Sequence, residues 1–523
     1  MKIFRKSLTK TFVSYRGKIM IRDFFMEDFM KLWKNGYFHT MEDPKTTYHS
    51  MATDHGLIIG FDDDIKDLKF DREIDLNKAH VYPGFVDAHL HLLGYGQMLL
   101  RPNLSHLKTK EEILFELKKL FKNEKLFVEG YRECGITKDD LNQISVEHPI
   151  LLRHNDYHSL TVNDKVLSLA GITHQTGVLT EEIAQHAIDS FPKYSQKEVE
   201  KILTHSLKNL YKYGITGGHS DDLYYFNGFD ETVSVFENVL DKFPFRAHLL
   251  MHHMTIDDFK KSGRTYLDQT YYLQLGAVKM FYDGTISSKT ALMKKPYANS
   301  NNYGQNVNGK ENFIEIVKKA RGYHLPIAVH VIGDQGLDEV IEIIKMYPPK
   351  MYHHDRLIHT PWIAKETIEE LKKLRVSLDI QPQFLSSDLP WALDFFQATP
   401  DLVFPWKTLL DAGLNLAGSS DAPVEIPNPL LGIHASVFRE SSHDGKPYFL
   451  EESLSRFEAI SMYTIGANYS TEHKNRGYLK VGYVADLSIF KHDLLSMHKD
   501  KFKEDIVEMT VIDERIVYDK NKV

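Results

Sequence analysis

The chain has 523 residues, a formal net charge of −8 at pH 7 and 42% hydrophobic residues. These values are typical of a globular protein with a sizeable core, and they favour neither nucleic acid nor an anionic membrane as a partner. The single cysteine, Cys134, excludes an internal disulfide and a cysteine-based zinc site, and it fits a reducing compartment, so we expect a cytoplasmic protein.

The N-terminal segment 1–29 is basic. Its first 25 residues carry seven Lys or Arg side chains against one acidic residue, without the apolar core of a secretory signal. Two interpretations stay open: an extension upstream of a start at Met26 or Met30, or an ordinary surface segment. No apolar run in the chain approaches the length of a membrane span, so we expect no membrane partner.

Both ends of the remaining chain are rich in short strands. In the segment 30–80, MKLWKNGYFHTM places Asn35-Gly36 between two strand-like runs, which predicts a hairpin, and HGLIIGFDDD predicts another strand. In the segment 475–523, VADLSIFKHD and VEMTVIDERIVYD read as strands, the latter with a turn at Asp513-Glu514. We therefore predict one small β domain assembled from both termini, with residues 441–474 as linking helices.

The middle of the chain, residues 81–440, alternates short apolar runs with amphipathic stretches such as ENFIEIVKKARGYH and GLDEVIEIIKMY. Apolar strands that alternate with helices predict a parallel sheet buried on both faces, and eight such units predict a (β/α)8 barrel of the α/β class. The predicted strands are 83–91, 215–220, 246–253, 277–284, 326–333, 356–363, 376–383 and 414–423.

A long segment separates the first and second predicted strands. Residues 92–210 contain FVEGYREC and HPILLRHNDYHSLTVND, which indicate further β structure. We predict an insertion after the first barrel strand, a natural place for substrate recognition.

Polar side chains gather where the predicted barrel strands end, and this is the face where such barrels carry their chemistry. The alternation of a strand places His89 and His91 on the same side, so two imidazoles can hold one ion. Each residue alone has an ordinary explanation: a hydrogen-bonded core histidine, a helix N-cap for Asp421, or an outward-pointing Lys279. Their joint occurrence at the ends of five strands predicts a shared site. The set comprises His89, His91, Lys279, Asp283, His330, His359 and Asp421.

Lys279 requires its own explanation, because a buried ammonium is costly and more so beside divalent cations. A neutral lysine amine can react with carbon dioxide to form an anionic carbamate. Its two oxygens can bridge two metal ions, so we expect this modification on Lys279.

The segments that carry these residues resemble the amidohydrolase superfamily of metal-dependent hydrolases, in the amidohydrolase family 3 or YtcJ-like branch, which includes N-substituted formamide deformylases. The resemblance runs from about Met30 to the C-terminus. It rests on segments in the family's order, among them PGFVDAHLH, DYHSLTVNDKVLSLAGI, GITGGHSD, VKMFYDGTISSKTALM, HVIGDQGLDEVI, RLIHT and AGSSDAPVEIPNPL. It implies a barrel with a small β-sandwich made from both termini.

The resemblance also implies a site. His89, His91 and Asp421 would hold one metal ion, His330 and His359 a second, and carboxylated Lys279 would bridge them. The resemblance places His158, Asn163 and Arg439 near the substrate. Two positions depart from the family pattern: RLIHT has Ile358 where glutamate is usual, and AGSSDAP has Ser420 where Gly-Ser-Asp is more usual. Both bear on the surroundings of the site and on the substrate rather than on the ligands.

These residues predict a metal-dependent hydrolase that cleaves a C–N bond in an amide, N-acyl or N-formyl compound. A metal-bound hydroxide would attack the carbonyl of a small-molecule substrate, with Asp421 as general base and with Asp87 and Asp283 supporting the ligands. The ligand types favour two zinc ions, although manganese or iron also suit them. Two alternatives stay open, a mononuclear deaminase and a non-catalytic scaffold, and so does homo-oligomer formation.

Overall fold

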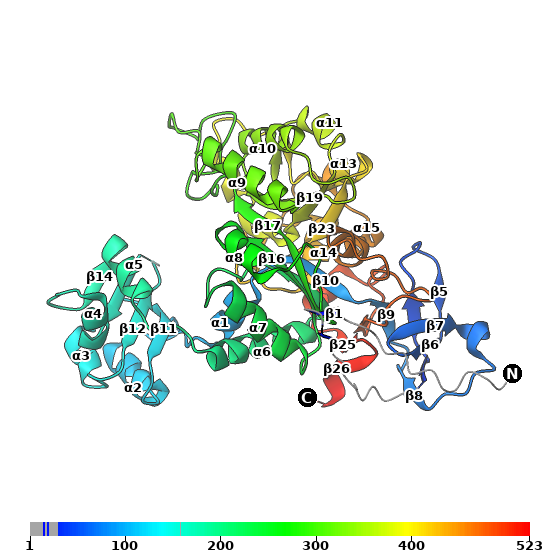
Figure 1. Ribbon diagram of the computed structural model, residues 1–523, viewed down its shortest axis with the longest axis horizontal. Coiled ribbons are helices and arrows are strands. Elements are labelled where there is room, and N and C mark those ends of the chain that lie inside the picture. The colour runs from blue at the N-terminus through cyan, green and yellow to red at the C-terminus, as the bar shows by residue number, and fades with distance from the viewer. Residues whose placement is uncertain (1–13, 16–17, 20–29, 157, 523) are drawn as a thin grey trace. The chain divides into compact units, whose positions relative to one another are not determined.

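The computed structural model describes residues 14–15, 18–19, 30–156 and 158–522. Most of the predicted N-terminal extension, 1–29, therefore lies outside the described residues; within it, β1 (Ser14–Tyr15) pairs with β2 (Lys18–Ile19). The chain forms two compact units, one of residues 1–95 with 206–523 and one of residues 96–205 (Figure 1). Across the described ranges, no helix has both the length and the apolarity to cross a membrane.

The larger unit contains the predicted eight-stranded parallel barrel sheet. All eight strands form where the apolar runs predict them, and each pairs in parallel with the next along the chain. They are β10 (Phe85–Leu90), β15 (Ile215–Ser220), β16 (Arg246–His252), β17 (Leu273–Phe281), β18 (Ile327–Val331), β19 (Asp355–His359), β21 (Val376–Ile380) and β23 (Asn415–Gly418).

The barrel closes between its first and last strands. Asp421 donates its backbone N–H to the carbonyl of His89, and His91 donates its N–H to the carbonyl of Ala422, each over 2.8 Å. These two bonds join the end of β10 to the segment that follows β23. The closing seam is thus made by residues of the predicted site itself.

Helices follow most of the barrel strands, as their amphipathic patterns predict. The predicted helix in ENFIEIVKKARGYH is α9 (Lys310–Gly322), and the one in GLDEVIEIIKMY lies within α10 (Asp334–Met346). The others of this unit include α7 (Phe229–Leu240), α8 (Ile256–Ser262), α11 (Thr367–Leu371), α12 (Pro382–Asp388), α13 (Trp406–Asp411), α14 (Pro429–Phe438), α15 (Arg456–Ser461) and α16 (Ala467–Ser470). α1 (Leu92–Leu100) leads out of the larger unit and α6 (Gln196–Lys212) returns to it.

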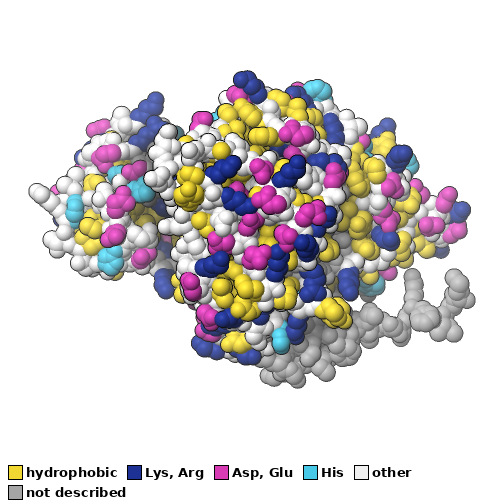
Figure 2. All heavy atoms as spheres, turned by 90° about the horizontal axis from the view of Figure 1, so that it is seen from above, with side chains coloured by type: hydrophobic (Ala, Val, Ile, Leu, Met, Phe, Trp, Pro, Cys, Tyr) yellow, Lys and Arg dark blue, Asp and Glu magenta, His cyan; other side chains and the backbone are white. Residues whose placement is uncertain are grey.

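Charged side chains of both signs are intermixed over the face shown in Figure 2, with hydrophobic side chains between them. This distribution agrees with the modest net charge of −8.

The two termini build a β-sandwich. One sheet has the strand order β26-β25-β24-β9-β4-β5 and the other β7-β6-β3-β8. Each sheet contains strands from residues 30–83, and the first also holds the C-terminal strands. The strands are β3 (Lys31–Lys34), β4 (Tyr37–His39), β5 (Thr47–Tyr48), β6 (Met51–Asp54), β7 (Leu57–Phe61), β8 (Arg72–Asp75), β9 (His80–Pro83), β24 (Leu487–Phe490), β25 (Val507–Ile512) and β26 (Arg515–Asp519).

The predicted hairpin at Asn35-Gly36 is wrong. β3 pairs with β6 and β8, whereas β4 pairs with β5 and β9, so this turn carries the chain from one sheet to the other. Trp33 before the turn and Phe38 after it both enter the core between the sheets. Burial of these two rings, rather than the local turn preference, decides the pairing. The other predicted turn, at Asp513-Glu514, does join a hairpin, β25 with β26.

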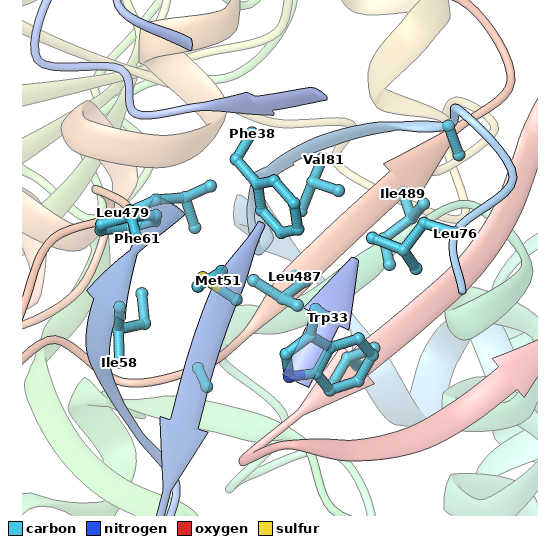
Figure 3. Close-up of a cluster of buried hydrophobic side chains, with 13 residues drawn as sticks. Trp33, Phe38, Met51, Ile58, Phe61, Leu76, Val81, Leu479, Leu487 and Ile489 are labelled. Atoms are coloured by element: carbon cyan, nitrogen blue, oxygen red, sulfur yellow. The ribbon is translucent and has the colours of Figure 1, made fainter. Parts of the chain in front are cut away.

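The core of the sandwich joins the two ends of the chain (Figure 3). Trp33, Met51 and Ile58 come from the smaller sheet, and they pack with residues of the larger sheet from both termini. Val81 comes from the N-terminal part and Leu487 from the C-terminal part, and neither is exposed. Because each terminus supplies part of one core, neither half can bury its apolar face alone.

The chain passes from sandwich to barrel at Gly84, between β9 and β10. A β-carbon at this position would lie 2.3 Å from Thr216 Oγ1, so only glycine fits the approach of β15. A second connection is the buried pair of Arg246 on β16 with Asp486, in which Nε and Nη2 donate over 2.9 and 3.0 Å. Such a two-bond arginine–carboxylate contact fixes orientation as well as position.

The smaller unit, residues 96–205, has its own sheet and cores. Its strand order is β11-β12-β13-β14, and two clusters of buried apolar side chains lie within it. The elements include α2 (Lys110–Leu120), β11 (Leu126–Tyr131), α3 (Lys138–Asn142), β12 (Ile150–His154), β13 (Ser159–Val162), α4 (Asp164–Ala170), β14 (Val178–Thr180) and α5 (Glu181–Asp189). FVEGYREC and HPILLRHNDYHSLTVND supply the first three strands of this sheet.

Replacing Leu487 by alanine should destabilise the protein, because its fully buried side chain packs in the core that joins the termini. We expect a loss of about 2–5 kcal/mol in the free energy of unfolding, measured by urea denaturation. The matched control is Leu450→Ala, at a leucine that is 57% exposed, with an expected change within about 0.5 kcal/mol. Equal effects of the two substitutions would contradict this account of the core.

Candidate metal centre

Three predicted ligands meet at the end of the barrel strands. His89 and His91 lie at the end of β10, and Asp421 follows β23. The Nε2 atoms of both histidines lie 3.3 Å from Asp421 Oδ1, and a candidate ligand atom from each of the three residues lies within 4.8 Å of the others. The side chain of His91 is 25% exposed and that of Asp421 13%, so solvent reaches this cluster.

The closing seam of the barrel sets this arrangement. Asp421 is held by its own N–H on the carbonyl of His89. The carboxylate of Asp87 accepts hydrogen bonds from the backbone N–H and the hydroxyl of Ser420 and from the backbone N–H of His89. Asp87 therefore ties β10 to the segment after β23 and supports the ligands through the backbone.

A second pair of histidines lies beside the first cluster. The rings of His330 and His359 are 4.5 Å apart between centroids, and His359 is 5.8 Å from His89. His330 Nε2 lies 3.2 Å from the carbonyl of Gly284, and His359 Nδ1 lies 2.7 Å from Gln381 Oε1. Because both oxygens only accept hydrogen bonds, these nitrogens carry the protons, and His330 Nδ1 and His359 Nε2 are left as lone-pair donors.

Lys279 reaches the same region from β17, but its partner is Asp221. Lys279 Nζ lies 3.1 Å from Asp221 Oδ2, and His91 Nδ1 lies 2.6 Å from Oδ1 of the same carboxylate. Lys279 is 1% exposed and Asp221 is fully buried. One carboxylate therefore compensates a buried ammonium and orients a ligand histidine.

The carboxylates of Asp221 and Asp421 remain negatively charged. Burial by itself would raise the pKa of Asp221, but the charges of His91 and Lys279 outweigh it and hold this pKa well below its ordinary value. For Asp421, burial acts in the same way and is outweighed by hydrogen bonds to His89 and His91, so its pKa is also well below the ordinary value. Both groups are thus ionised near pH 7.

The histidines divide into two classes. Burial, with the nearby charge of Lys279, lowers the pKa of His89 and of His330 to about 4, and burial with His330 lowers that of His359 well below its ordinary value. These three rings are neutral near pH 7. For His91, burial is outweighed by Asp221 and Asp421, which hold its pKa well above the ordinary value.

The residues fit divalent metal ions. Neutral imidazole nitrogens and an ionised carboxylate are ligands of zinc, manganese or iron. The contact from Asp221 to His91 Nδ1 leaves Nε2 facing Asp421, the arrangement in which a carboxylate orients a metal-binding histidine. Asp221 and Asp421 together favour positive charge at His91, and a divalent ion on its Nε2 would supply it. The buried His89 Nδ1 has no hydrogen-bond partner among the described residues.

Asp283 follows β17 and organises the loops rather than touching a ligand side chain. It accepts the backbone N–H groups of Leu292, Ile332 and Gly333 over 2.8–3.0 Å. Burial raises its pKa to about 6. Through these bonds Asp283 joins the loop after its own strand to the loop after β18.

Of the three predicted substrate contacts, two are buried and hydrogen-bonded to the backbone. Asn163 is fully buried and caps α4, with its amide bonded to Val166 N, Ile150 N and two carbonyls. Arg439 is also fully buried, and its guanidinium donates to four backbone carbonyls. These bonds hold the chain together and leave neither side chain exposed in this structure, and contact of Asn163 and Arg439 with substrate stays a prediction. His158 is exposed in the smaller unit, and its role stays a prediction.

Sequence reasoning missed Asp221 as the central partner of the site. The signal was present, since Asp221 directly follows the second predicted strand, at the same edge as the predicted ligands. Gln381 follows the seventh strand in the same way and orients His359. A third residue, Arg356 on β19, donates to the carbonyl of Ala88 over 2.7 Å and to Asp379, so it holds β10 from inside the barrel.

Comparisons with known proteins agree with this fold. A family model described as the amidohydrolase family matches residues 72–518. The putative amidohydrolase YtcJ of Bacillus subtilis is 34% identical over 530 aligned residues, which span 94% of this chain and 99% of that protein. The chain belongs to the amidohydrolase family.

Two further proteins are similar to this amidohydrolase over most of their length. The N-substituted formamide deformylase of Arthrobacter pascens is 23% identical over 502 aligned residues, covering 86% of this chain and 90% of that protein. A crystal structure of an uncharacterized metal-dependent hydrolase from Pyrococcus horikoshii superimposes with a TM-score of 0.79 and 25% identity, over 90% of this chain and 99% of that one. The second of these proteins is named as a metal-dependent hydrolase, and it shares the fold of this chain.

Substituting Asp221 by alanine should impair both stability and metal binding, because Lys279 would lose its buried counter-charge and His91 its orienting contact. We expect the free energy of unfolding to fall by about 3–5 kcal/mol. We expect the metal affinity to fall by about 10–100-fold. Urea denaturation and metal titration measure the two effects. The control is Asp230→Ala, at an exposed position on α7. If the Asp221 variant bound metal as tightly as the wild type, the carboxylate of Asp221 would not support the site.

Proposed function

We propose that this amidohydrolase cleaves a C–N bond of an amide, N-acyl or N-formyl compound at a binuclear metal site. The observation that carries the proposal is the convergence of four histidines and one aspartate around Lys279 at the end of the barrel strands. These side chains come from β10, β18, β19 and the segment after β23, so the barrel itself assembles them.

His89, His91 and Asp421 would hold one ion, His330 and His359 the other, and a carbamate on Lys279 would bridge the two. When bound, divalent ions such as zinc supply Lewis acidity and make hydroxide available near neutral pH. The protein supplies the fixed orientation of these groups, through Asp221, Gln381 and the carbonyl of Gly284.

Asp421 is the proposed proton carrier. It is ionised near pH 7, because His89 and His91 hold its pKa well below the ordinary value against the effect of burial. Its side chain is 13% exposed, so its carboxylate is accessible from the solvent side. Asp421 would accept the proton of the attacking water and deliver it to the leaving amine, as general acid–base catalysis requires.

Lys279 decides between two forms of the site. As an ammonium it is paired with Asp221, and this pair favours a mononuclear form with His89, His91, one further histidine and Asp421, which is the arrangement of the deaminase alternative. As a carbamate it would place a second negative charge beside Asp221. Two divalent ions would offset that repulsion, so carbamate formation and binding of the second ion should depend on each other.

The substrate class rests on the relatives. Similarity to the N-substituted formamide deformylase suggests which substrates to test. The test panel comprises N-substituted formamides and longer N-acyl amides. The scaffold alternative is disfavoured, because the proposed ligands are present and are positioned together.

Asp421→Asn should lower kcat by about 10²–10⁴-fold, because the amide cannot take up the proton. Hydrolysis of the panel is measured with metal content determined in parallel, so that the loss is expressed per bound ion. The control Asp230→Asn, which makes the same change at an exposed position, should retain wild-type kcat. Undiminished kcat in the Asp421 variant would exclude this residue as the proton carrier.

Lys279→Met removes the amine that would carry the carbamate while it retains an aliphatic stem of similar length. For a binuclear site we expect one metal equivalent fewer than in the wild type, together with loss of hydrolysis, when both proteins are loaded with zinc in bicarbonate buffer. Elemental analysis provides the count. If both metal content and hydrolysis stay intact, the binuclear form is wrong; if metal content alone is unchanged, the mononuclear form is supported.

A further inference from the structure

A second group of metal-ligand side chains lies in the β-sandwich, outside the barrel. His39 ends β4, His80 begins β9, and Asp493 follows β24. His39 Nε2 lies 3.0 Å from His80 Nδ1 and 3.8 Å from Asp493 Oδ1. One candidate ligand atom from each of the three residues lies within 4.8 Å of the other two.

The strand pairing brings these residues together. β4 pairs in parallel with β9, with Tyr37 opposite His80 and Phe38 opposite Val81, and β9 pairs with β24. Phe38 and Val81 enter the sandwich core, so the alternate residues His39 and His80 share the opposite face of the sheet. The cluster is thus a fixed feature of the sheet that joins the two termini.

Aromatic contacts orient both imidazoles. His80 stacks on Tyr37 with 4.8 Å between ring centroids, and His39 stacks on Tyr82 at 4.4 Å with an interplanar angle of 8°. The hydroxyl of Tyr82 donates to Asp493 Oδ1 over 2.7 Å. Orientation of ligands by neighbouring groups of this kind is typical of metal sites.

We propose that His39, His80 and Asp493 bind a divalent transition-metal ion, with zinc as the best match, at a site separate from the barrel. Ligand atoms about 2.0–2.2 Å from one ion lie roughly 3–3.5 Å from each other in a tetrahedral site, close to the separations seen here. Water would complete the coordination, because His80 and Asp493 are only partly buried. The ion would join the N-terminal strands to the C-terminal part of the sandwich.

The groups present can accept such an ion. Asp493 Oδ1 accepts from Tyr82 and from the N–H of Leu495, whereas Oδ2 accepts only from the hydroxyl of Ser496. Oδ2 therefore retains an acceptor position for a cation, and binding through it requires the Asp493 carboxylate to turn from the orientation in which Oδ1 lies 3.8 Å from His39. The competing explanation is a histidine–histidine hydrogen bond beside an aspartate that caps a turn.

Metal is first removed from the full chain by a chelator. The number of zinc ions that the protein then binds at micromolar free zinc is measured. His80→Gln and Asp493→Asn should each bind one equivalent less than the wild type. The control His498→Gln makes the same substitution at a histidine with a 72% exposed side chain and should match the wild type. Hydrolysis should be unchanged in all three variants, because the barrel ligands are intact.

Thermal unfolding gives a second readout. Zinc should raise the melting temperature of the wild type more than that of either ligand variant, because the ion binds only the folded sandwich. An anomalous difference map at the zinc edge should show a peak between His39 and His80. The proposal would be overturned if His80→Gln and Asp493→Asn bound as much zinc as the wild type, or if zinc-soaked crystals showed no such peak. Either result leaves the proposed hydrolase function untouched.

Discussion

The closure of the barrel between β10 and β23 is the constraint on which the site depends. Two backbone hydrogen bonds, from Asp421 to His89 and from His91 to Ala422, join the first strand of the barrel to the segment after its last strand. Three of these residues, His89, His91 and Asp421, are the proposed ligands of one metal ion. The bonds that close the barrel therefore also bring these three ligands together. Asp87 and Ser420 reinforce this seam, and Arg356 holds β10 from the interior.

The charges around this seam form a balanced set. Asp221 is fully buried, and its two oxygens contact His91 and Lys279, so one carboxylate compensates the ammonium and fixes the imidazole. Removal of any member leaves an uncompensated charge in a region of low dielectric constant, which is more costly than the pair itself is stabilising. A carbamate would replace the positive charge of Lys279 by a negative one beside Asp221. Its formation should therefore depend on bound cations.

The sandwich contributes to the barrel as well as to its own stability. Its core takes strands from both ends of the chain, and β9 runs directly into β10 through Gly84. The buried pair of Arg246 and Asp486 fixes a second barrel strand to the C-terminal part of the sandwich. A metal ion at His39, His80 and Asp493 would add a third connection between the two halves of the chain.

The sequence by itself determined the barrel and the β domain made from both termini, and it pointed to the six strand-end side chains of the proposed site, because strand periodicity and strand order place those residues at one edge. Only the tertiary structure decided the partners. Asp221 could not be recognised as the counter-charge of Lys279, since the two are 58 residues apart and meet through the barrel. Asn163 and Arg439 are expected near the substrate from sequence, and only the structure shows that both are fully buried and hydrogen-bonded to the backbone. Asn35-Gly36 has the local preference of a hairpin, yet burial of Trp33 and Phe38 between two sheets outweighs it. Local pattern fixes which residues lie at the ends of elements, whereas long-range packing and charge compensation decide what each side chain contacts.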